Sequence, residues 1–349
     1  MTTSLEAELK QLDEKGHFAY QNGEMDEALA LYWSRAELAS EHAMRKELAE
    51  SYKAIGLILH DKGDWEKSLV ELEKSIDIQR SILAEQLPPD DSGPDYTLSM
   101  ATSQLELANT YKNLAEVYRA TSQLQDALDQ LQKAQKIESQ FAPNSLVLAE
   151  TFFSMGNTFQ EVQNFKMALD YHTQACEIRM ALCPDTLACS CSASIIGLIL
   201  FKMGKSESAL HYLQMALNVE EKLIPDTLDL ADSYSNVGEV LFKLQRYQEA
   251  LTAFEGALTL KLSLDANSLN VCKTHSDVGY VLHMLGQDDA AQEQFLQAID
   301  LEEHLIPGSK ELFNSYSHLV ASLNKQNKDA SVWEEKMSKI RETRPDAQQ

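Results

Sequence analysis

The sequence contains few of the residues that interrupt helices. Only 13 glycines and 8 prolines occur among 349 residues, whereas 44% of the residues are hydrophobic. This composition predicts a mostly helical protein with enough apolar material for a large core. The five cysteines include no Cys-x-x-Cys pair and follow neither a disulfide framework nor a zinc spacing. We therefore expect reduced cysteines and no structural metal ion.

Long apolar runs and an excess of basic residues are also missing. No apolar stretch approaches the roughly 18 residues that a membrane helix needs, and residues 1–16 are polar and acidic, unlike a signal or transit peptide. We expect a cytoplasmic protein with no membrane partner. The 30 lysines and arginines face 54 acidic residues, giving a net charge of −24. This balance argues against nucleic acid as a partner, because phosphate contacts require clustered cations. The acidic excess is explained either by a solvated outer surface or by a preference for basic partners.

Catalytic motifs are absent as well. The tripeptide at residues 204–206 has the letters of a phosphate-binding loop, but Ile199 stands where its partner glycine belongs. The nine histidines form no His-Glu-x-x-His motif. We therefore predict a protein that is not an enzyme and uses no cofactor. An enzyme remains the alternative from a different class, and it would need a polar cluster that the repeat pattern does not explain.

What the sequence does contain is a repeat of 41 residues. A glycine is followed by a small residue after 12 positions and by another after 19, as in Gly238, Ala250 and Ala257. The same positions recur in four further copies: Ala115, Ala127 and Ala134; Gly156, Ala168 and Ala175; Gly197, Ala209 and Ala216; Gly279, Ala291 and Ala298. Two earlier copies, displaced by an insertion, have Gly56, Ser68 and Ser75, then Gly16, Ala28 and Arg35. Each copy predicts two amphipathic helices that bury their apolar faces only when copies stack.

This pattern resembles the tetratricopeptide repeat, in which paired helices carry small residues at their closest approach. The usual repeat has about 34 residues, and the seven or so extra residues are close to two helical turns. Long repeats of this kind are similar to those of kinesin light chains, while a HEAT-like scaffold is the second choice. The resemblance implies an all-α, right-handed superhelical solenoid of about eight helix pairs.

The repeats divide the chain into four ranges. We expect repeats one and two in residues 1–86, an inserted loop in 87–98, repeats three to seven in 99–305, and a degenerate eighth repeat with a C-terminal cap and tail in 306–349. The prolines of the inserted loop predict an extended segment, which is either a tolerated insertion or a binding or modification loop. At the joints PNSLVLAE, PDTLACS, PDTLDLA and DANSLNV, a Ser or Thr side chain is placed to cap the following helix.

The resemblance also implies a binding surface, because the first helix of each repeat in such proteins lines a concave groove. Projected onto this sequence, repeats four to seven present mainly large apolar residues, with amides and lysines beside them. The candidate binding residues are Phe153, Asn157, Ile195, Leu198, Phe201, Lys202, Asn236, Phe242, Lys243, Tyr280 and Met284. The apolar members are equally explained as core residues, because an apolar stripe at helical spacing is most often buried.

The predicted function is a non-catalytic scaffold or adaptor that binds a peptide or helix of a partner protein. Exposed apolar patches mark such partners. The asparagines could hydrogen-bond an extended peptide backbone, and the lysines could hold an acidic side chain. The alternative within the binding class is a peptide-sensing regulatory protein. The sequence leaves the oligomeric state open.

Overall fold

The computed structural model describes residues 2–85 and 94–343. These residues form sixteen α-helices and no strand, which confirms the predicted all-α class. No described helix is long and apolar enough to span a lipid bilayer. In chain order the helices are α1 (Thr2–Gln21), α2 (Met25–Glu41), α3 (Arg45–Asp61), α4 (Trp65–Glu85), α5 (Pro94–Ala120), α6 (Leu124–Phe141), α7 (Leu146–Glu161), α8 (Phe165–Leu182), α9 (Leu187–Lys202), α10 (Ser206–Leu223), α11 (Leu228–Lys243), α12 (Tyr247–Asp265), α13 (Leu269–Met284), α14 (Asp288–Leu305), α15 (Lys310–Lys325) and α16 (Ser331–Thr343).

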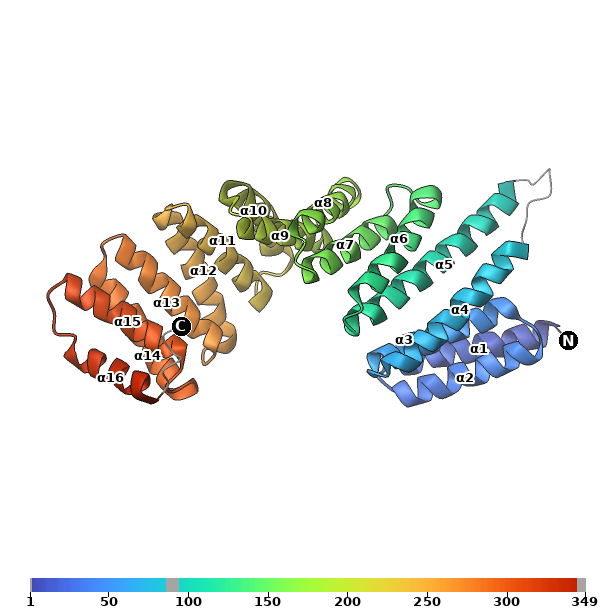
Figure 1. Ribbon diagram of the computed structural model, residues 1–349, viewed down its shortest axis with the longest axis horizontal. Coiled ribbons are helices and arrows are strands. Elements are labelled where there is room, and N and C mark those ends of the chain that lie inside the picture. The colour runs from blue at the N-terminus through green and yellow to red at the C-terminus, as the bar shows by residue number, and fades with distance from the viewer. Residues whose placement is uncertain (1, 86–93, 344–349) are drawn as a thin grey trace. The chain divides into compact units, whose positions relative to one another are not determined.

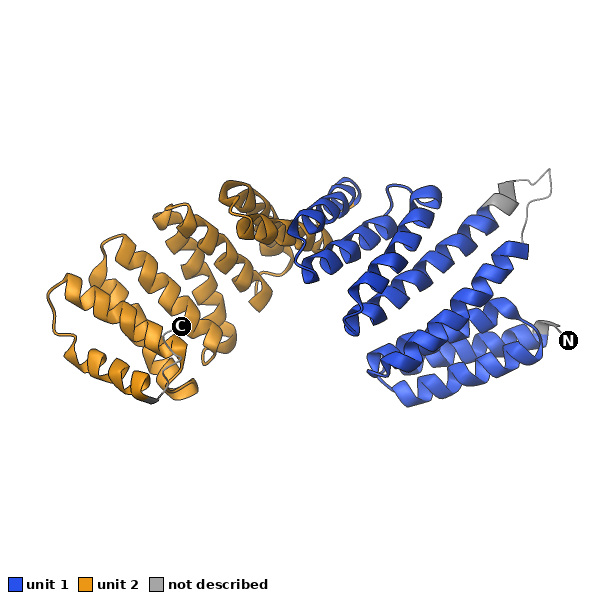
Figure 2. Ribbon diagram, in the orientation of Figure 1, with its two compact units in different colours: residues 1–182 blue, residues 183–349 orange. Residues whose placement is uncertain are grey.

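The chain divides into two compact units, which Figure 2 shows in different colours. Unit 1, residues 1–182, holds α1 to α8, and unit 2, residues 183–349, holds α9 to α16. Within each unit every helix packs against the next helix along the chain (Figure 1). This is the stacking of helix pairs that an α-solenoid requires. The right-handed superhelical course stays a prediction.

The four ranges expected from the sequence also stay predictions, because the two units group helices by compactness and not by repeat. Part of the inserted segment at 87–98 lies outside the described residues, which omit 86–93. The end of that segment is helical, since α5 begins at Pro94, a position where proline suits the first turn of a helix. The expected tail at 344–349 lies outside the described residues as well.

Each helix pair closes where a residue without a large side chain faces a large one. A Cβ atom added to Gly238 of α11 would stand 2.9 Å from the Phe254 ring of α12. One added to Gly279 of α13 would stand 2.7 Å from the Phe295 ring of α14. Because the two backbones approach this closely only where no Cβ intervenes, the glycine sets how deeply the second helix docks. The recurring glycine of the sequence is therefore a packing requirement.

The small residues that recur with the glycine are buried beside this contact. Those twelve positions after it are all 0% exposed: Ala28, Ser68, Ala127, Ala168, Ala209, Ala250 and Ala291. Arg35 is the exception to the small pattern, yet it too is buried. Its guanidinium donates hydrogen bonds to the Ser51 hydroxyl at 3.0 Å and to the Glu50 carboxylate at 2.8 Å. These partners offset the cost of burying a charge where other repeats have alanine.

Side-chain caps begin most of the predicted helices that follow a joint. The hydroxyls of Ser145, Thr186 and Thr227 accept hydrogen bonds from the backbone N–H three residues later, at 3.2–3.4 Å, which confirms these N-caps. The fourth predicted cap is wrong. The Ser268 side chain makes no cap hydrogen bond, and its hydroxyl donates instead to the carbonyl oxygen of Asp265 at 3.0 Å.

The last helix pair is atypical. Val320 stands where the repeat has glycine, and α16 buries only one side, with Met337 and Ile340 inside. Glu334 and Glu335 of the same helix are exposed. A terminal helix with one polar face ends a stack of pairs without leaving an apolar surface in water.

A substitution at the closest helix approach should separate packing from helix propensity. Gly238→Ala should lower the free energy of unfolding, because overpacking costs about 1–3 kcal/mol and exceeds the roughly 0.5–1 kcal/mol that alanine gains over glycine within a helix. Gly256→Ala is the matched control in the partner helix, where an added Cβ meets Tyr234 only at 3.5 Å. This control should be neutral or stabilising in denaturant titrations. Equal effects of the two variants would contradict the docking role of Gly238.

Candidate functional site

The first helices of unit 2 carry nine of the eleven candidate binding residues. Ile195, Leu198, Phe201 and Lys202 lie on α9, Asn236, Phe242 and Lys243 on α11, and Tyr280 and Met284 on α13. Tyr280 and Met284 are 39% and 43% exposed, the two lysines are exposed, and the other five are half-buried. Phe153 and Asn157 lie on α7 of unit 1 and are half-buried. None of the eleven therefore belongs to the buried core, although burial alone does not test their role in binding.

Three rings on successive first helices of unit 2 lie in contact. Phe242 of α11 is 5.2 Å from Tyr280 of α13, and Tyr280 is 5.2 Å from His318 of α15, measured between ring centroids. Tyr247 at the start of α12 also contacts Phe242, at 5.4 Å. We call Phe242, Tyr280 and His318 the aromatic row. Ring pairs at such distances contribute about 0.5–1.5 kcal/mol beyond their buried area, so the row is held in place by its own members.

The ring of Phe153 in unit 1 is covered by other side chains. The Arg179 guanidinium lies over it at 4.6 Å from the ring centroid, and the His172 ring is 5.2 Å away. His172 is 0% exposed and fills the place opposite Gly156 that Phe254 fills opposite its glycine. Burial, together with the charge of Arg179, lowers the pKa of His172 to about 4. Phe153 is thus part of the local packing of unit 1 as well as a candidate contact.

A polar cluster lies beside Met284, where α13 turns into α14. Asp288 is buried, pairs with His283 at 2.6 Å, and pairs with Lys325 of α15 at 3.1 Å. Burial raises the pKa of Asp288, but the hydrogen bonds from Lys325 and His283 outweigh it and hold the pKa below its ordinary value. The cluster ties two first helices together. Among the described residues, no group of three or more His, Cys, Asp or Glu side chains could hold a metal ion.

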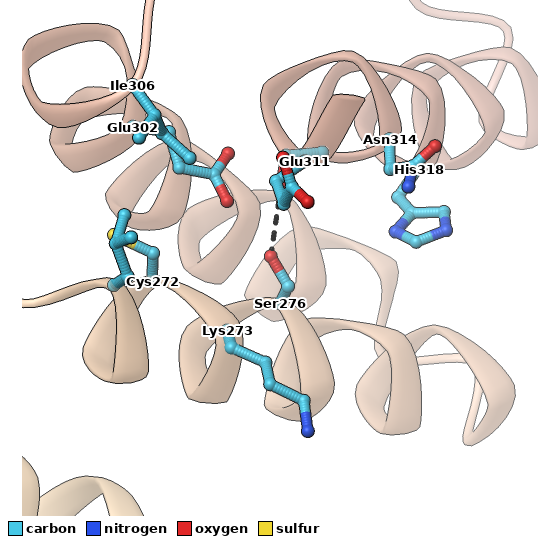
Figure 3. Close-up of a pocket in the computed structure, with 10 residues that line it drawn as sticks. Cys272, Lys273, Ser276, Glu302, Ile306, Glu311, Asn314 and His318 are labelled. Atoms are coloured by element: carbon cyan, nitrogen blue, oxygen red, sulfur yellow. Dashed lines mark hydrogen bonds between the residues drawn. The ribbon is translucent and has the colours of Figure 1, made fainter. Parts of the chain in front are cut away.

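A cavity of about 400 Å³ adjoins the aromatic row at His318 (Figure 3). It lies between α13 and α15, with the end of α14 on its third side. Cys272 and Ser276 come from α13, Glu302 from α14, and Ser315 from α15. The Ser276 and Ser315 hydroxyls are hydrogen-bonded to each other at 3.2 Å.

The sequence analysis missed this cavity and the last ring of the row. His318 escaped because the eighth repeat lacks the glycine from which groove positions were counted. A usable signal was present, since residues 242, 280 and 318 are separated by a constant 38 positions. Glu302 escaped because a single glutamate on an acidic helix carries no sign of burial.

Comparisons with known proteins agree with this architecture. A sequence profile of the tetratricopeptide repeat matches residues 106–181, 188–261 and 229–303. No curated protein sequence matches the chain. Among solved structures, a signal transduction ATPase with a tetratricopeptide repeat sensor from Pyrococcus horikoshii is similar at TM-score 0.65 and 15% identity, covering 97% of this chain and 47% of that one.

Two further structures cover most of their own length. BtubC (BKLC) from P. vanneervenii is similar at TM-score 0.53 and 16% identity, covering 75% of this chain and 92% of that chain. Nearly identical repeats described as kinesin light chain repeats of Podosopora anserina are similar at TM-score 0.50 and 15% identity, covering 57% and 96%. These likenesses show the fold, and they confirm the expected similarity to kinesin light chain repeats.

The buried histidine beside Phe153 should make unit 1 sensitive to acid. The pKa of His172 lies below that of an unfolded histidine, so the unfolded state binds more protons between about pH 6.5 and pH 4. Stability is fully present above this window and should fall as the pH decreases through it. His172→Leu, which copies Leu213 of the next repeat, should reduce this loss in melting experiments, whereas His211→Leu at an exposed position should not. An identical pH profile for all three proteins would contradict the assignment.

Proposed function

Because the chain belongs to the tetratricopeptide repeat family, we propose that it is a non-catalytic protein-interaction module that binds a peptide or helix of a partner protein. The binding surface is the side of unit 2 formed by α9, α11, α13 and α15. The charge balance supports a protein partner over nucleic acid, since 54 acidic residues face only 30 basic ones. A cytoplasmic location is part of the proposal.

The aromatic row is the observation that carries this proposal. Its central ring, Tyr280, is 39% exposed although it contacts aromatic neighbours on both sides. Exposed apolar side chains grouped in this way usually mark a surface for a partner. Rings held by their neighbours lose little freedom when a ligand arrives, which favours binding.

The polar candidates on the same helices suit an extended peptide. The Asn236 side chain has both a donor and an acceptor for a peptide backbone. Lys202 and Lys243, five residues after the glycine in adjacent repeats, are placed to meet an acidic side chain. A peptide-sensing regulatory protein would use the same surface, and its output would be read in a different assay.

Loss of the row's first two rings should weaken binding without unfolding the protein. Peptides would be selected from a random displayed library on the immobilised 349-residue chain, and their affinities measured by fluorescence anisotropy. Phe242→Ala and Tyr280→Ala should each weaken the selected peptides by about 1–2 kcal/mol, or roughly fivefold to thirtyfold. Melting temperatures should change little, because neither residue is buried.

The matched control is Phe18→Ala on α1, whose side chain is 65% exposed in unit 1. It should leave the affinity unchanged. A failure to select any peptide, or equal affinity loss for Phe18→Ala, would contradict the proposed surface. Unfolding of Phe242→Ala would show that the ring is needed for the fold.

A further inference from the structure

One position near the end of the second helix carries a polar residue in five successive pairs. Glu138, Arg179, Glu220, Lys261 and Glu302 are spaced by 41 residues and alternate in charge. Four of them are buried, and Arg179 is half-buried. Thirteen residues after each one, on the first helix of the next pair, stands a hydroxyl residue: Thr151, Ser192, Ser233, Thr274 and Ser315. The comparison of these five sites shows what each buried charge requires.

Glu138 has its counter-charge inside the chain. Its carboxylate accepts a hydrogen bond from the Thr151 hydroxyl at 2.6 Å and lies 3.7 Å from the ammonium of Lys112. Lys112 stands 26 residues earlier, on the first helix of the same pair, and is itself buried. A buried carboxylate paired in this way avoids most of the cost of leaving water.

Lys261 has an equivalent arrangement with the charges reversed. Its ammonium lies 3.0 Å from the Asp232 carboxylate and donates hydrogen bonds to Ser235 at 3.1 Å and Thr274 at 3.3 Å. Ser235 stands 26 residues earlier, at the position that Lys112 occupies in its own pair. The pattern of partners is therefore the same at both ends of the comparison.

Glu302 keeps the hydroxyl partner but lacks a cation. Ser315 hydrogen-bonds to its carboxylate, and the position 26 residues earlier is Ser276, too short and uncharged to pair with it. Glu302 is only 3% exposed, and its Oε2 has no hydrogen-bond partner among the described residues. Burial raises the pKa of Glu302; the Ser315 hydrogen bond opposes this rise and the charge of Glu311 adds to it.

The space that Lys112 fills in its own pair is a cavity beside Glu302. Figure 3 shows the carboxylate directed into it, between α13 and α15. Lys273 is the one lysine or arginine among its lining residues in the described chain, and its ammonium is paired with Glu239 at 2.8 Å, directed away from Glu302. Leu269 and Ile306 give the cavity an apolar wall.

We propose that this cavity receives the side chain of a lysine or arginine from a bound peptide, whose positive charge pairs with Glu302 as Lys112 pairs with Glu138. The apolar wall suits the aliphatic stem of such a side chain, which packs on apolar surface while its head reaches a polar group. His318 joins the cavity to the aromatic row, so one peptide can occupy both. The inference rests on the proposed function and names the chemistry of its ligand.

The binding probe is N-acetyl-lysine methylamide, titrated into the methyl-labelled 349-residue chain and followed by NMR. Saturable shifts of the Ile306 and Leu269 methyl signals should appear, and Glu302→Gln should weaken them at least tenfold. Glu220→Gln is the matched control at the same repeat position, two pairs earlier, and should bind like the parent. N-acetyl-norleucine methylamide, which has the stem without the charge, should not bind. Equal binding by Glu302→Gln, or by the norleucine compound, would overturn the proposal.

An internal lysine should close the cavity. Ser276→Lys copies the Lys112 arrangement, so it should raise the melting temperature and abolish binding of the lysine compound. Unchanged binding by a folded Ser276→Lys variant would show that the compound sits elsewhere. Unchanged stability together with unchanged binding would remove the comparison with Glu138 altogether.

Stability measurements separate loss of the site from loss of the fold. The raised pKa of Glu302 means that ionising it destabilises the folded state, an effect absent below the unfolded pKa and complete above the folded one. Glu302→Gln should therefore melt at the same or a higher temperature than the parent at pH 7, and the difference should shrink as the pH falls. A lower melting temperature at pH 7 would contradict the view of Glu302 as an unpaired buried charge.

The peptide selection distinguishes this inference from the proposed function. Peptides selected on the parent chain should share a lysine or arginine at a fixed position, and those selected on Glu302→Gln should not. Peptides that need Phe242 but show no basic preference would overturn the cavity's role and leave the proposed function standing. Binding of the lysine compound without any selectable peptide would have the opposite meaning.

Discussion

The contact between a glycine and the large side chain opposite it sets the geometry on which the rest of the structure depends. At Gly238 and Gly279 the neighbouring ring occupies the space of the missing Cβ, so the second helix of the pair docks at one depth and one rotation. The repeat spacing carries this geometry from pair to pair. The first helices of a unit then present the same side of their surface in succession, and residues far apart in sequence come together as the aromatic row.

The joints between pairs are where the chain departs from its own regularity. Inside a pair the contact is almost entirely apolar, whereas the end of each second helix buries a polar or charged group against the next pair. A buried charge is stable only with a partner, and the partner differs from joint to joint. Functional differences between repeats arise at these joints, since the packing inside the pairs leaves little room for variation.

The sequence predicted those features that depend on the pattern of small and apolar residues. The glycine and alanine register gave the helix pairs, and the Ser or Thr at three joints gave N-caps at Ser145, Thr186 and Thr227. The groove positions were correct to the extent that none of the eleven residues is buried. Their division between two units, however, depends on packing between distant helices, which no local pattern reveals.

Other features were invisible for physical reasons. Whether a glutamate such as Glu302 is buried, and whether a lysine reaches it, depends on side-chain positions three helices apart. The cap at Ser268 failed although its sequence resembles the others, because its hydroxyl found a nearer acceptor at Asp265. Propensity supplied the candidates in both cases, and the tertiary contact decided between them.

The hydroxyl that follows each buried charge has a consequence for how such a gene can grow. The charged partners Lys112 and Asp232 sit within the same pair as the residue they neutralise, so a duplicated pair takes its counter-charge with it. The adjoining pair contributes only a serine or threonine, which can donate to a carboxylate, as Thr151 does, or accept from an ammonium, as Thr274 does. A newly inserted pair therefore meets no charge of the wrong sign at its downstream neighbour, and the array can lengthen by whole pairs without redesign of its joints.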